Sequence, residues 1–169
     1  MHRLFLLRHA QAGWAQAGMR DHDRPLTDSG RSDAEAMGRK MRMAGYFPDL
    51  VLCSTATRAR QTWECVAPAL NSDEPKVDYL EALYSTDAAG HVRLIREFAG
   101  AATALLVVGH NPMMEDLAIA LPAGKGEAAE AIASGFPTSG LAVLDFSDRW
   151  QSLSPGSGAL EAFVTPAEL

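Results

Sequence analysis

Three short apolar runs, each followed by polar residues, constrain the fold of this chain more than any other feature. They occupy residues 4–7, 50–53 and 104–108. Each has the length of a buried β-strand, and amphipathic segments with helical spacing separate them. Uniformly apolar strands that alternate with helices are typical of a largely parallel sheet covered by helices on both faces. The sequence therefore predicts an α/β fold with a mostly parallel central sheet.

The same periodicity, together with local helix caps and breakers, predicts the individual elements. We expect strands at about residues 2–7, 49–53, 76–84 (leading into a loop), 104–108, 141–146 and, at a sheet edge, 162–165. We expect one helix from the cap Thr27 to Gly45, and a second that begins at a cap at Ser54 or Thr55 and continues until Pro68 disrupts it. A third helix is expected over residues 88–99. A fourth should run from the cap Asn111, with Pro112 at the first helical position, to Leu121, and a weaker helix should end at Ser134. Residues 152–159 are expected to form a surface loop.

Length and composition fit a single domain over residues 1–169. With 169 residues and a hydrophobic content of 47%, the chain can form a core without disulfides or a metal. The formal net charge of −6 and the lack of a Lys/Arg-rich block argue against nucleic acid or an anionic membrane as the main partner. The first apolar run is too short for a signal peptide, and Cys53 and Cys65 fit no disulfide framework. We therefore expect a cytoplasmic protein in which both cysteines are packing residues.

Basic side chains follow all three apolar runs. Arg8 and His9 end the first run, Arg58 follows shortly after the second, and His110 follows the third. Parallel α/β sheets bind their ligands beyond the carboxyl ends of the strands. The sequence thus predicts that two guanidinium groups and two imidazole rings meet at one rim of the sheet.

Four such groups in one cleft match a phosphoryl group in charge and in number of oxygens. Arginine stays charged and binds phosphate with two donors, whereas a histidine beside two arginines loses its proton more easily than usual. A neutral His9 can attack phosphorus in line while Arg8, Arg58 and His110 bind the equatorial oxygens, and water then releases phosphate. We therefore expect a phosphate or sulfate anion in the pocket and no cofactor. We also expect no metal, because no His/Cys/Asp spacing resembles a metal site.

Several further residues have two interpretations. Glu81, after the third strand, is the candidate acid for a leaving group that needs a proton, but its spacing does not distinguish it from Asp78 or Asp87, and it also fits an exposed surface glutamate. Ser54 and Asn111 either cap helices or bind phosphate oxygens. Without partner motifs, His2, His22 and His91 are interpreted as surface histidines, with His22 in a loop overhanging the pocket, and Trp14 and Trp63 as packing residues.

The motifs that carry these residues resemble the histidine phosphatase superfamily, also called phosphoglycerate mutase-like. They are Leu-Arg-His-Ala at 7–10, the segment from Ser54 through Arg58-Ala59-Arg60-Gln61-Thr62, and Gly109-His110-Asn111-Pro112, in the family's order and nearly spanning the chain. The Arg-Pro-Leu-Thr segment at 24–27, the short length and the Gly-His-Asn-Pro form look most like the SixA-type phosphohistidine phosphatase branch.

The resemblance implies a fold and a set of roles. The fold would be a three-layer α/β/α sandwich, and His9 would be the phosphorylated nucleophile. Arg8, Arg58 and His110 would form the phosphate pocket, with Arg24 approaching the substrate from the loop after the first strand. Glu81 stands three residues before Tyr84, as the mutases' acid stands before a tyrosine, although SixA-type enzymes do not depend on that acid.

Departures from the family pattern bear on the substrate. Ala10 replaces a frequent glycine, and Gln11 with Ala12 replaces the usual Glu-Ser or Glu-Thr, which argues against mutase activity. The mutases' capping insertions are missing, so an uncapped pocket would admit a phosphorylated protein more readily than phosphoglycerate. The leading hypothesis is thus a phosphatase for phosphohistidine in a signalling or phosphotransfer protein. The alternatives are a phosphomonoesterase for small metabolites, which would need Glu81 or an equivalent acid, and a non-catalytic module that binds phosphorylated ligands.

Overall fold

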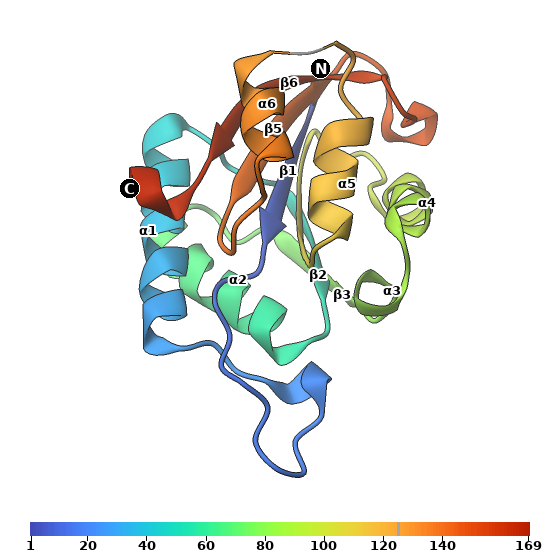
Figure 1. Ribbon diagram of the computed structural model, residues 1–169. Coiled ribbons are helices and arrows are strands. Elements are labelled where there is room, and N and C mark those ends of the chain that lie inside the picture. Colours follow the sequence, from blue (N-terminus) through green and yellow to red (C-terminus); the bar gives the residue numbers. More distant parts are fainter. Residues whose placement is uncertain (125) are drawn as a thin grey trace.

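Six strands form one sheet in the computed structural model, which describes residues 1–124 and 126–169. They are β1 (His2–Arg8), β2 (Leu50–Ser54), β3 (Lys76–Leu80), β4 (Ala104–Gly109), β5 (Leu141–Phe146) and β6 (Gly158–Val164). Their order across the sheet is β3-β2-β4-β1-β5-β6 (Figure 1). β3, β2, β4 and β1 pair in parallel, whereas β5 is antiparallel to both β1 and β6. All strands but β5 therefore run in one direction, which confirms the mostly parallel sheet.

Helices cover both faces of this sheet (Figure 1). The helices are α1 (Asp28–Ala44), α2 (Thr57–Leu70), α3 (Ala82–Ser85), α4 (Ala88–Phe98), α5 (Met113–Ala120) and α6 (Glu127–Ala133), and short 3₁₀ turns are η1 (Asp21–Asp23), η2 (Trp150–Ser152) and η3 (Pro166–Glu168). Residues of α1 and α2 share one buried cluster with the sheet, and residues of α3 to α6 share the other. The fold is thus the expected three-layer α/β/α sandwich.

The central strand β1 shows how the sequence produces the two layers of core. Leu4 and Leu6 pack in the cluster with α3 to α6, whereas Phe5 and Leu7 pack in the cluster with α1 and α2. Successive side chains of a strand point to opposite faces, so a continuous apolar run fills both cores. Full burial of such a side chain stabilises the fold by roughly 1.5–3 kcal/mol. Because β1 lies inside the sheet, the residues that follow it are held at the middle of the carboxyl edge.

Helix α1 begins and ends as its sequence predicts. The Thr27 side chain accepts a hydrogen bond from the Gly30 amide at 3.0 Å, which satisfies one of the free N–H groups of the first turn. At the other end, Gly45 adopts a left-handed conformation with φ 76°, a conformation that glycine adopts without steric cost. These two caps fix where the loop from β1 enters the helix.

The prediction that Pro68 ends the second helix is wrong. Pro68 lies inside α2, which continues to Leu70 and begins after Ala56 rather than after a side-chain cap at Ser54 or Thr55. A proline removes one hydrogen bond of the helix, but here only two residues follow it. Trp63 and Val66 anchor the preceding turns in the core, so packing outweighs this local loss.

Other boundaries also differ from the expectation. Helix α5 starts at Met113, with Pro112 at its cap position and not in its first turn. Strand β6 starts at Gly158 and is therefore longer than the expected edge strand, because its pairing with β5 includes the end of the expected loop. The strand β3 ends at Leu80, and the short helix α3 follows where a loop was expected.

Some individual side chains correct the sequence interpretation. His91 is fully buried on α4 and hydrogen bonds the Asp87 carbonyl through Nδ1 at 2.7 Å, so it is not a surface histidine. Trp14, interpreted as a packing residue, is 92% exposed, whereas Trp63 is buried as expected. Within the described residues, 1–124 and 126–169, there is no helix with the length and apolar character needed to cross a bilayer.

Candidate active site

The ends of β1 and β4 bring the two candidate histidines together. Arg8 pairs with Gly109 in the parallel register, and the His9 amide donates a hydrogen bond to the Gly109 carbonyl at 2.9 Å. The rings of His9 and His110, which follow these two paired residues, lie with their centroids 5.1 Å apart. The register of two neighbouring strands therefore places both imidazoles at one rim.

The His9 ring is held in a defined orientation. Its Nδ1 lies 2.6 Å from the Ala10 carbonyl oxygen, which can only accept, so Nδ1 carries the hydrogen and Nε2 keeps the lone pair. The side chain is buried, and burial lowers its pKa to about 4, with Arg58 and Arg8 contributing in the same direction. His9 is therefore neutral at pH 7, with Nε2 in the nucleophilic form.

His110 lies beside Ser54, which ends β2. His110 Nε2 and Ser54 Oγ are 2.8 Å apart, and both side chains are buried. Burial, and next His9 and Arg58, lower the His110 pKa to about 3. The ring of Tyr84 packs edge-on against His110 at a centroid distance of 5.5 Å. The imidazole of His110 is thus a neutral hydrogen-bonding group in the free protein.

Arg8 closes the opposite side of the rim through the segment before β5. Arg8 Nη1 donates to the Phe136 carbonyl at 2.9 Å, and Asn111 Nδ2 donates to the same oxygen at 3.0 Å. Asn111 Oδ1 also accepts from the Glu115 amide at 3.2 Å, so Asn111 links this segment to the first turn of α5. The Arg8 Nε atom is buried without a partner, which leaves a donor available for a ligand.

Asp21 is a site residue that the sequence analysis missed. Its carboxylate accepts from Arg58 Nη2 at 3.1 Å, from Arg24 Nε at 3.0 Å and from the Tyr84 hydroxyl at 2.8 Å. Its backbone carbonyl also accepts from Arg58 Nη1 at 2.8 Å. The Tyr84 hydroxyl, and next the Arg58 guanidinium, lower the pKa of this carboxyl group. Asp21 thus gives both arginines an anion within the protein.

Glu81 lies at the mouth of the site rather than in the pocket. Its carboxylate accepts a hydrogen bond from the Thr55 hydroxyl and lies 3.4 Å from His22 Nε2. Its side chain is 65% exposed. Tyr84 and Asp21 link the side chains of His110 and Arg58, and contacts with these groups add His9, Ser54 and Arg24. Arg8 and Asn111, the chain neighbours of the two histidines, share the Phe136 carbonyl beside them, and Glu81 lies at the edge of this rim.

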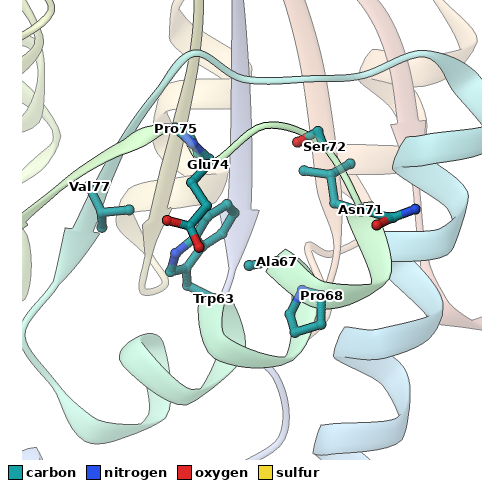
Figure 2. A pocket seen from close by; sticks show the side chains of 9 residues that line it. Trp63, Ala67, Pro68, Asn71, Ser72, Glu74, Pro75 and Val77 are labelled. Carbon is teal, nitrogen blue, oxygen red and sulfur yellow. The ribbon is translucent and has the colours of Figure 1, made fainter.

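Two of the open volumes lie at different ends of the molecule. A groove of about 740 Å³ borders the rim at Arg8 and Asn111 and continues between the segment before β5 and η3. A second cavity, of about 500 Å³, is lined by Trp63, Glu74 and Val77 and lies where α2 ends and β3 begins (Figure 2). That is the amino end of the parallel strands, so this cavity is not part of the candidate site.

The geometry suits transfer of a phosphoryl group. The neutral imidazole of His9 lies beside the buried imidazole of His110 and the arginine guanidiniums, and fixed donors of this kind can stabilise the charge that spreads over phosphoryl oxygens in a transition state. In the chain outside residue 125, no group of three His, Cys, Asp or Glu side chains is arranged to hold a metal ion. The positive charge at this rim comes from arginine side chains.

Comparisons with known proteins agree with this geometry. The sequence model of the histidine phosphatase superfamily (branch 1) matches residues 4–90. An uncharacterized protein of Mycobacterium tuberculosis is 39% identical over 163 residues, which cover 95% of this chain and 99% of that protein. The solved structure of a candidate phosphohistidine phosphatase SixA from Agrobacterium tumefaciens is 37% identical, with a TM-score of 0.80 and 98% coverage of both chains. Its counterpart from Nakamurella multipartitia is 31% identical, with a TM-score of 0.84, and the match covers 98% of this chain and 96% of that one.

Proposed function

Because this chain belongs to the histidine phosphatase superfamily and has the fold of its SixA-type members, we propose that it removes phosphoryl groups from phosphohistidine in a signalling or phosphotransfer protein. The observation that carries this proposal is the state of His9. Its Nδ1 is tied to the Ala10 carbonyl and its pKa is lowered to about 4. The free Nε2 is therefore ready to attack at neutral pH.

The proposed reaction has two steps. His9 Nε2 attacks phosphorus, the bond to the leaving nitrogen breaks, and a phosphohistidine forms on His9. Arg8, Arg58 and His110 bind the non-bridging oxygens, and the buried Arg8 Nε supplies one free donor. Water then attacks the phosphohistidine and releases phosphate. Because arginines supply the positive charge, we propose that turnover does not depend on a metal ion and is unchanged by a chelator.

A protein substrate is favoured by the surface beside the rim. The groove of about 740 Å³ starts at Arg8 and Asn111 and can accept the chain that flanks a phosphorylated side chain. A small phosphorylated metabolite would leave this groove unfilled. The proposal therefore predicts a much higher kcat/KM for a phosphohistidine-bearing protein than for a generic aryl phosphate, and equal values would contradict the choice of substrate.

A trapping experiment tests the covalent step. The protein is mixed with a labelled phosphohistidine protein and quenched, and the label on the enzyme is tested for the acid lability and base stability of phosphohistidine. We expect label on the wild-type chain and none on His9→Ala. His2→Gln is the matched control, because His2 lies at the opposite end of the same strand. An unlabelled wild-type chain that still binds phosphate would instead identify a non-catalytic binding module.

A further inference from the structure

The loop between β1 and α1 holds a tryptophan that the fold leaves in solvent. Within residues 1–124 and 126–169, Trp14 is the most exposed of the large apolar side chains, at 92%, whereas Trp63 and Trp150 are buried. An indole contributes most when a large area of it is removed from water. Packing within the chain therefore does not account for a tryptophan at this position.

The residues around Trp14 are also uncharged and open to solvent. Residues 10–19 contain no Asp, Glu, Lys or Arg, although these types make up 21% of the chain. All of residues 14–18, which we call the Trp14 loop, are exposed. A single exposed apolar side chain is ordinary on a protein surface, but a tryptophan within a continuous uncharged surface is typical of a site that binds another protein.

Backbone hydrogen bonds fix the base of the Trp14 loop. The Gly13 amide donates to the Pro25 carbonyl at 3.0 Å, and the Thr27 amide donates to the Gln11 carbonyl at 3.0 Å. The loop projects beyond the end of β1 (Figure 1). Because its base is already held in place, a partner that binds the loop loses less of its binding free energy to the ordering of the backbone.

Direct contacts connect the Trp14 loop to the rim of the candidate site. The Gly13 carbonyl, next to Trp14, accepts a hydrogen bond from Arg24 Nη1 at 3.0 Å. Arg24 Nε donates to the Asp21 carboxylate at 3.0 Å, and this carboxylate also accepts from Arg58 Nη2 at 3.1 Å. A protein that places a phosphorylated side chain in this rim must therefore lie beside the Trp14 loop.

We propose that the Trp14 loop is a docking surface for the substrate protein and binds apolar side chains that flank its phosphohistidine. This inference rests on the proposed function, because the phosphoryl group would enter the same rim. The loop has no charged side chain to offer a partner, and nearby charges already pair with one another, Arg20 with Asp23 and Arg24 with Asp21. An apolar side chain on the indole leaves water without leaving a charge unpaired.

Three substrates with the same leaving group separate docking from chemistry. They are the free amino acid phosphohistidine and two short peptides with a central phosphohistidine, one flanked by leucines and the other by serines. We expect wild type to prefer the leucine peptide over the serine peptide by about tenfold in kcat/KM, and Trp14→Ala to lose this preference. The loss should lie in KM with kcat unchanged, because docking does not act on phosphorus. Free phosphohistidine should be turned over equally by both chains.

A matched control and a second readout accompany the kinetics. Met43→Ala removes another exposed apolar side chain, 83% exposed in the last turn of α1 and thus at the far end of that helix from the loop, and should keep the wild-type preference. Trp63 and Trp150 are buried, so a change in the solvent exposure of an indole reports Trp14. When the leucine peptide binds the His9→Ala chain, the tryptophan emission should shift to shorter wavelength.

Several results would overturn this inference while leaving the proposed function intact. They are a wild-type chain without a preference between the peptides, a preference that survives in Trp14→Ala, and an equal loss on free phosphohistidine, which would give Trp14 a structural role. A wild-type dimer in sedimentation that is lost in Trp14→Ala would assign the loop to a second copy of the chain and would also overturn it. A wild-type chain that turns over none of the three substrates and traps no label would refute the proposed function, and the inference with it.

Discussion

Removing the charge of Asp21 should tighten the binding of phosphate. In the free protein the Asp21 carboxylate accepts hydrogen bonds from Arg58, Arg24 and Tyr84. A phosphate ion that binds the same guanidiniums must share them with this carboxylate and is repelled by its charge. Asp21→Asn keeps an oxygen acceptor for these donors and removes the negative charge.

The size of the effect follows from Coulomb's law. Arg58 Nη2 lies 3.1 Å from the carboxylate, and a phosphate oxygen would lie at a similar distance on its other side. Taking about 5 Å from the carboxylate to the phosphorus of a dianion, the repulsion in water is about 1.7 kcal/mol. Salt at about 0.15 M screens roughly half of it. The remaining ~0.9 kcal/mol corresponds to about a fourfold decrease in the Kd for phosphate.

Calorimetric titration with inorganic phosphate at low and high salt measures this change. The difference between Asp21→Asn and wild type should shrink as salt increases. Asp23→Asn is the matched control, because Asp23 pairs with Arg20 at 2.8 Å and hydrogen bonds neither Arg58 nor Arg24. Unchanged or weaker binding by Asp21→Asn would refute the reasoning and would mean that the carboxylate mainly holds the arginines in place for the ligand.

Three further predictions follow from burial and close contacts. Arg58→Ala should lower kcat on an aryl phosphate by about 10²- to 10³-fold in steady-state assays, and a smaller loss would show that the other donors suffice. Gly30→Ala should lower the free energy of unfolding by roughly 1–3 kcal/mol, since a Cβ there would lie 2.2 Å from the Gln11 carbonyl oxygen; denaturant titration measures this. The pKa of folded His9 is about 4 and that of His110 about 3, below the value of about 6.5 in the unfolded chain. Between these pH values the unfolded chain binds more protons than the folded chain, so the free energy of unfolding decreases as pH falls, by about 3 kcal/mol for His9. Urea unfolding at several pH values should show this slope, and it should weaken in His9→Ala.

Strand ends were predictable because two independent patterns agree on them. The apolar runs identify the buried strands, and the parallel arrangement brings their carboxyl ends to one edge. Arg8, His9 and His110 stand at the ends of their runs and Arg58 follows shortly after its run, so their meeting could be inferred from order alone. Thr27 and Gly45 similarly define α1, because each satisfies a local backbone requirement.

Residues in the long loop after β1 were harder to place because no periodic pattern constrains them. Asp21 and His22 contact the pocket only because η1 folds back over it. Tyr84 was visible only as a neighbour of Glu81, and its contacts with Asp21 and His110 depend on the short helix α3. The acidic Asp-His-Asp segment before Arg24 was the available signal, since carboxylates beside basic motifs at a rim pair with them.

The reversed direction of β5 decides which half of the chain can reach the rim. Because β5 is antiparallel to β1, the segment that enters β5 lies at the edge where β1 leaves the sheet. There the Ser139 amide donates hydrogen bonds to the Arg8 and His9 carbonyls at 3.0 and 3.1 Å. The Phe136 carbonyl accepts a hydrogen bond from Arg8 Nη1. A parallel strand in the same slot would have left this connection at the far side of the molecule. This single reversal of strand direction thus lets the carboxyl-terminal third of the polypeptide help build a rim whose proposed nucleophile, His9, lies within the first ten residues.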